Sequence, residues 1–120
     1  MSRKLRAPKY LILNASDSTT SPISTETGVK QLDTVLYSIT VGASVNAILE
    51  VQGSSDDENT FTKTFESLDF AQTLSLNGAA ETQYQIVIRD NPYAFMRLKI
   101  TNNGGTGNIT AYVSGVSKGA

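Results

Sequence analysis

Cysteine, histidine and tryptophan are all absent from this chain of 120 residues. Without cysteine the chain can form no disulfide, no thiolate metal site and no cysteine nucleophile. Without histidine it lacks the side chain that most often serves as a general base, a metal ligand or the partner of a nucleophilic serine. We therefore expect a protein that is not an enzyme, with no catalytic residue, no metal and no cofactor.

Long apolar runs are missing as well. No segment approaches the roughly 20 apolar residues that a membrane span needs. The basic start of the chain has the charge of a signal peptide, but only residues 10–13 follow as an apolar run, too few for the apolar region of such a peptide. We expect a soluble protein that folds in a cytosol and has no membrane partner.

The net charge of -1 conceals an asymmetry along the chain. Arg3, Lys4, Arg6 and Lys9 are four of the ten basic residues, so the rest of the chain has six basic residues against eleven acidic ones, a net charge of -5. The sequence thus predicts a basic N-terminal arm at residues 1–8 in front of one acidic domain at 9–120. Such an arm suits contact with nucleic acid or with an acidic protein surface, and the plain alternative is a solvated chain end.

Alternation of apolar and polar residues is the main structural signal. It predicts strands near residues 9–14, 34–41, 45–51, 60–66, 72–77, 82–89, 94–101 and 108–113. Turn-forming residues separate these strands at intervals of roughly ten residues, a spacing typical of all-β domains. We predict an all-β fold, an antiparallel β-sandwich or jelly roll of about eight strands. Residues 15–28 have no periodicity and are predicted to be a long loop or an extended segment lying on a neighbour.

Two structural details follow from the same pattern. The runs 94–101 and 108–113 flank a stretch rich in Asn and Gly, which predicts a β-hairpin. The side chains on the inward face of the predicted strands are expected to form the core. The predicted core residues are Val35, Tyr37, Ile39, Val45, Ala47, Leu49, Val51, Phe65, Leu74, Leu76, Ile86, Ile88, Met96, Leu98, Ile100, Ile109, Ala111 and Val113.

Two groups of side chains are candidates for binding. Asp56-Asp57-Glu58 is the densest carboxylate cluster, but its spacing does not match an EF-hand loop, and we interpret it as a solvated loop. Tyr93, Phe95 and Tyr112 are aromatic residues that either stack on sugars or belong to the core or a subunit interface. Because tryptophan is absent, we assign them to the core or a subunit interface, and these three are the candidate subunit-interface residues. The basic residues near the last strands are too sparse for a nucleic-acid footprint on an acidic body.

Three stretches carry a resemblance to a known class of protein. These are Val51-Gln52-Gly53-Ser54-Ser55-Asp56, the run from Tyr93 to Thr101, and Gly104-Gly105-Thr106-Gly107 with the strand after it. Together they resemble the small β-sandwich virion proteins of tailed bacteriophages, over roughly residues 34–116. The shared motifs are turn and strand patterns and not catalytic signatures.

The resemblance implies a capsid decoration or cement protein that stabilises the outer face of the phage head. Its partners would be the major capsid protein and itself, as a homotrimer, and not nucleic acid. It would be made in the host cytoplasm and located on the outer capsid surface. The arm residues Arg3, Lys4, Arg6 and Lys9 would then contact the capsid. Two alternatives stay open, a neck, tail or head-fibre component and a carbohydrate-binding β-sandwich module.

Overall fold

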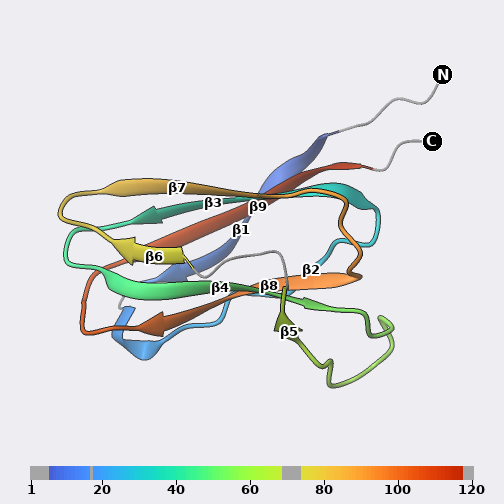
Figure 1. Ribbon diagram of the computed structural model, residues 1–120, viewed down its shortest axis with the longest axis horizontal. Coiled ribbons are helices and arrows are strands. Elements are labelled where there is room, and N and C mark those ends of the chain that lie inside the picture. Colours follow the sequence, from blue (N-terminus) through green and yellow to red (C-terminus); the bar gives the residue numbers. More distant parts are fainter. Residues whose placement is uncertain (1–5, 17, 69–73, 118–120) are drawn as a thin grey trace.

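The computed structural model describes residues 6–16, 18–68 and 74–117. These residues form nine β-strands and one 3-10 helix (Figure 1). The elements are β1 (Arg6–Ala15), η1 (Ser18–Thr20), β2 (Thr27–Gly28), β3 (Leu32–Val41), β4 (Asn46–Ser54), β5 (Glu66–Ser67), β6 (Leu74–Asn77), β7 (Thr82–Ile88), β8 (Phe95–Asn102) and β9 (Ile109–Ser117). No helix in this described part of the chain is long and apolar enough to cross a membrane.

The strands form two antiparallel sheets. The first sheet has the order β1-β9-β3-β7 and the second β2-β8-β4-β5, with β6 also paired to β4 (Figure 1). Strands from the two halves of the chain pair with each other: β1 with β9, β2 with β8, β3 with β7 and β4 with β6. A long antiparallel ribbon wound into two sheets in this way is a jelly roll. The predicted all-β antiparallel sandwich is therefore confirmed.

The inward faces of both sheets meet in one core, where complete burial of each large apolar side chain stabilises the fold by about 1.5–3 kcal/mol. Most of the predicted core residues are buried. Phe65, Leu74 and Ile86 are only partly buried, and the prediction missed Ile12, Leu13, Val29, Val41 and Leu68, which are buried. Burial also raises the pKa of the Tyr37 phenol above its usual value, so this ring is a neutral part of the core.

β1 is an edge strand of the first sheet and is longer than predicted. It begins at Arg6, so residues 6–8 of the expected arm are part of a strand. Its register against β9 shifts twice, between Ala7 and Tyr10 and between Leu11 and Leu13. The second shift breaks the alternation, which explains why the adjacent Ile12 and Leu13 are both buried.

The predicted hairpin of the last two strands is wrong. β8 pairs with β2 and β4 in the second sheet, whereas β9 pairs with β1 and β3 in the first. The loop between them crosses from sheet to sheet and lies against the loop that joins β3 to β4. Thr106 N–H donates to Ser44 O at 2.8 Å and Asn103 N–H donates to Asn46 O at 2.8 Å. Alternation shows which face of a strand is buried but not which strand lies beside it.

Within the stretch at 15–28, Ser18–Thr20 form η1, and residues 22–28 lie extended along β8. Ser24 N–H donates to Leu98 O at 2.9 Å, and Ile100 N–H donates to Pro22 O at 2.9 Å. The Ser24 hydroxyl accepts a further bond from Leu98 N–H at 2.8 Å. The segment therefore extends the short strand β2 along the edge of β8.

The crossing loop provides a test of this packing. A Cβ atom at Gly105 would lie 2.1 Å from Asn46 N and 2.6 Å from Ser44 O, both backbone atoms that cannot move aside. We expect Gly105→Ala to lower the free energy of unfolding by about 2 kcal/mol, measured by urea denaturation. Gly42→Ala is the matched control, because its Cβ would meet Asn108 backbone atoms at an ordinary 3.6 Å. Equal stability of the two variants would contradict the close approach of the loops.

Candidate functional site

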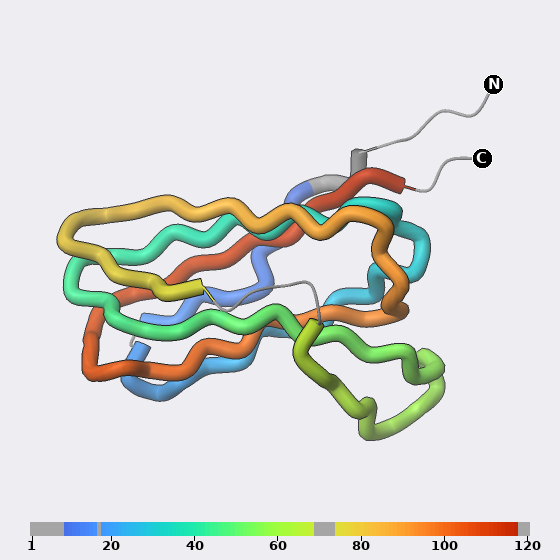
Figure 2. Tube along the Cα trace, in the orientation of Figure 1, coloured from blue at the N-terminus to red at the C-terminus, as the bar shows by residue number. Residues whose placement is uncertain are grey.

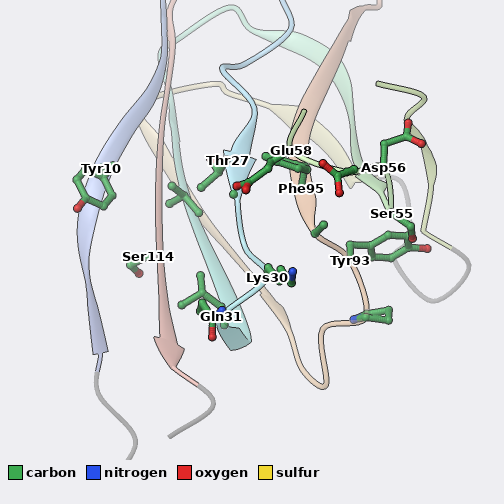
Figure 3. A pocket seen from close by; sticks show the side chains of 16 residues that line it. Tyr10, Thr27, Lys30, Gln31, Ser55, Asp56, Glu58, Tyr93, Phe95 and Ser114 are labelled. Carbon is green, nitrogen blue, oxygen red and sulfur yellow. The ribbon is translucent and has the colours of Figure 1, made fainter. Parts of the chain in front are cut away.

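An open groove of about 680 Å³ lies between the sheets at one side of the sandwich. β1 and β9 border it on one side, and residues 27–32, 55–58 and 92–95 border it on the others (Figure 3). Its lining is mixed. The aromatic residues are Tyr10, Tyr93 and Phe95, the charged ones Lys30, Asp56, Asp57 and Glu58, and the remainder Thr27, Gly28, Gln31, Leu32, Ser55, Pro92, Ala94, Val113 and Ser114.

The buried side chain of Asn91 joins two of the segments that form the groove. Its amide Nδ2 lies 2.8 Å from Val29 O, 3.2 Å from Leu32 O and 3.1 Å from Tyr93 O. Its Oδ1 accepts a hydrogen bond from Tyr93 N–H at 2.9 Å. A single side chain therefore satisfies backbone groups before β3 and before β8, and it fixes the position of Tyr93.

The ring of Tyr93 packs on the backbone of Gly53 in β4. A Cβ atom at Gly53 would lie 2.6 Å from the ring, so a larger residue there would displace the ring. Tyr10 comes from β1 on the other side of the groove and is 58% exposed (Figure 3). The groove thus presents aromatic rings from two sides.

Part of the acidic side of the groove has a structural role. Asp56 Oδ2 accepts hydrogen bonds from Thr64 N–H at 2.6 Å and from the Ser54 hydroxyl at 3.3 Å, and Asp57 Oδ1 accepts one from Asn59 N–H at 2.8 Å. These bonds order the loop after β4. No group of three or more potential metal-ligating side chains comes together within the described ranges. Rings, carboxylates and hydroxyls in this arrangement suit binding of a polar ligand by stacking and hydrogen bonds.

The residues of the predicted subunit interface are not all in one place. Tyr93 and Phe95 line the groove. Tyr112 lies on the outer side of β9, beneath Lys9, whose Nζ is 4.6 Å from the ring centroid. The groove and the outer side of β9 therefore each have a separate aromatic surface.

The basic residues of the predicted arm are described only in part. Arg3 and Lys4 lie outside the described residues. Arg6 pairs with Val116 as the first residue of β1. Lys9 is exposed and contacts Tyr112.

Sequence reasoning missed Asn91, Gly53 and Tyr10. Asn91 precedes a proline and reads as an ordinary turn residue, although an Asx side chain is well suited to bonding to nearby backbone. Gly53 begins a polar stretch, and nothing in the sequence around it indicates that the Tyr93 ring packs on its backbone. Tyr10 shares a short apolar run with core residues, and only the register of β1 shows that it is exposed.

Comparison with known proteins gives likenesses of fold. No protein-family model matches the chain, and no curated protein matches it in sequence. The crystal structure of the SPBc2 prophage-derived protein YomS superposes with a TM-score of 0.63, at 13% identity, over 98% of this chain and 97% of that chain. This likeness shows a shared fold over the full length of both chains. A CBM4 structure aligns with a TM-score of 0.44, at 18% identity, over 79% of this chain and 59% of that chain, and this lower similarity supports no argument.

Asn91→Asp tests the central role of the Asn91 amide. The oxygen that replaces Nδ2 would face three carbonyl oxygens and no donor, so we expect the free energy of unfolding at pH 7 to fall by about 3 kcal/mol or more, measured by urea denaturation. Burial and the carbonyls would raise the pKa of this carboxyl in the folded state. The deficit should therefore shrink as the pH falls toward about 4, where the carboxyl is protonated. Asn103→Asp, at an exposed position, is the control, and a similar loss in both variants would contradict the assignment.

Proposed function

We propose that this chain is a structural protein of a bacteriophage virion, and that it decorates and stabilises the outer face of the capsid. The main support is the full-length likeness to a prophage-derived protein, in which the whole chain of each protein takes part. The jelly roll itself is common among viral capsid proteins. The proposed role is non-enzymatic and needs no cofactor.

The proposed partners are the major capsid protein and further copies of this chain, as a homotrimer. The charge distribution supports a capsid contact through the N-terminus. The basic residues at positions 3, 4, 6 and 9 precede or begin the edge strand β1, while the rest of the chain has a net charge of -5. Such a segment is attracted to an acidic lattice at low ionic strength.

Deletion of residues 2–5 tests this capsid contact. The deletion ends before β1, so the fold should be retained and the melting temperature should stay near that of the wild type. We expect binding to capsids assembled from the major capsid protein of the same phage genome to weaken on the order of tenfold at low salt, and the difference to shrink at high salt. Co-sedimentation with the capsids measures the affinity.

The double substitution Arg3→Gln with Lys4→Gln is the matched control for chain length. An equal loss of binding would assign the effect to charge. Unchanged binding of both variants would reject the role of the N-terminus. A wild-type protein that binds no capsid at any salt concentration would reject the decoration function itself.

The groove supports a second candidate function, the binding of a glycan. Aromatic rings at Tyr10 and Tyr93 can stack on the apolar faces of sugar rings, and carboxylates beside them can accept hydrogen bonds from sugar hydroxyls. This candidate uses the groove and leaves the N-terminus free, so the two functions can be tested separately.

Tyr10→Ser tests the glycan candidate. Tyr10 is largely exposed, so the substitution should leave the fold intact while removing one stacking ring. A glycan array would identify a ligand, and titration of tyrosine emission would then measure the affinity, which we expect to fall about tenfold or more. Tyr112→Ser, which removes a tyrosine outside the groove, should have no effect. The absence of any ligand on the array would reject this candidate.

A further inference from the structure

Three neighbouring strands of the first sheet, β9, β3 and β7, are almost free of charged residues. Residues 34–41, 82–88 and 109–117, which are most of β3 and all of β7 and β9, contain no Asp, Glu, Lys or Arg, although 18% of the chain is charged. By contrast, the exposed or half-exposed positions of β8 include Arg97 and Lys99. We call the outward side of these three uncharged segments the neutral face.

Apolar side chains lie close together on the neutral face. Leu36 pairs with Val87, and Tyr112 pairs with Leu11 at the edge of the sheet. Val87 is 44% exposed, and the remaining outward positions are serine, threonine and glutamine with Val116 at one end. Lys9 borders this face above Tyr112. Depletion of charge around apolar and aromatic side chains is the composition of the core of a protein interface.

A second surface differs from the neutral face because it combines an exposed aromatic side chain with acidic ones. The loop at residues 55–65, which we call the aromatic loop, projects from the sandwich between β4 and β5 (Figures 1 and 2). On this loop the Phe61 side chain is fully exposed, at 102%. Exposed Asp57 and Glu58 lie on the same loop. The loop thus offers one large aromatic ring beside two carboxylates.

Contacts with the second sheet fix the aromatic loop in place. Lys63 Nζ lies 3.1 Å from Glu26 Oε1 and 4.5 Å from the centroid of the Phe95 ring. Arg97 Cζ lies 4.1 Å from the centroid of the Phe65 ring. Because the loop is ordered before any partner binds, little conformational entropy would be lost when Phe61 packs against a partner.

We propose that the aromatic loop of one copy docks on the neutral face of a second copy. Phe61 would then cover apolar side chains such as Leu36 and Val87 without removing water from any charge. The carboxylates of Asp57 and Glu58 would lie near Lys9 at the border of the face. A second copy is the partner that fits, since its neutral face supplies the apolar surface and Lys9 at the border of that face supplies a cation for the two carboxylates.

The positions of the two surfaces bear on the kind of assembly. The aromatic loop belongs to the second sheet and the neutral face to the first, so each copy donates one surface and accepts with another. In the proposed homotrimer such a contact is head-to-tail, and it closes into a ring when the rotation allows. The inference rests on the homotrimer of the proposed function and not on capsid binding.

Sedimentation equilibrium of Phe61→Ser tests the inference. Loss of a buried aromatic anchor should weaken self-association on the order of thirtyfold or more, so that the variant sediments as a monomer where the wild type is a trimer. Its thermal melt should show an intact fold, because Phe61 makes no buried contact in the single chain. Ile48→Ser, which removes a 38% exposed apolar side chain from the second sheet, should leave the trimer unchanged. A trimeric Phe61→Ser variant would overturn the inference.

A charge exchange tests the pairing of the two surfaces. Lys9→Glu and Glu58→Lys should each weaken the trimer by repulsion across the contact, and the double variant should restore it. Weakening by both single variants without restoration in the double variant would overturn the proposed orientation.

Failure of this inference can be told apart from failure of the capsid role. A wild-type protein that is a monomer at all concentrations, or a twofold dimer, overturns the head-to-tail contact whether or not it binds capsids. A trimer that dissociates on Phe61→Ser supports the contact even if the wild type binds no capsid in co-sedimentation.

Discussion

Both sheets depend on β8 and β9, each of which pairs on both edges with strands from the first half of the chain. β9 joins β1 to β3, and β8 joins β2 to β4. Until these two strands are in place, the early strands have no common neighbour and the core residues they carry are exposed. The fold therefore depends on pairings between residues far apart in sequence. The chain between them loses conformational entropy on closing these loops before the new contacts stabilise the structure. The crossing loop around Gly105 and the Asn91 amide fix the two ends of this arrangement.

The sequence allowed prediction of the local features of the fold, and the structure explains why the rest could not be predicted. Alternation identified β3, β4, β7, β8 and β9 and most of the core, because burial of one face follows directly from the pleat. Pairing partners depend on contacts between distant segments, so the hairpin prediction for residues 94–113 failed although both of its strands exist. Residues 22–28 lie along β8 through hydrogen bonds that their own sequence pattern does not indicate.

The candidate site was predictable only in part. Tyr93 and Phe95 were singled out from the sequence as candidate subunit-interface residues, and they line the groove. Their arrangement depends on Gly53, Asn91 and the register of β1, none of which has a distinctive sequence signal. The neutral face was present in the sequence as three uncharged strands, but only the topology shows that these strands are neighbours in one sheet.

The two register shifts in β1 affect how copies of this protein can meet. A straight edge strand exposes a row of unpaired N–H and C=O groups, on which a strand of another molecule can add and begin an ordered aggregate. The shifts at residues 7–10 and 11–13 interrupt that row in β1, the longest edge strand in the described part of the chain. An irregular edge disfavours the continuous addition of strands from other molecules, so this edge of the sandwich is protected against ordered aggregation.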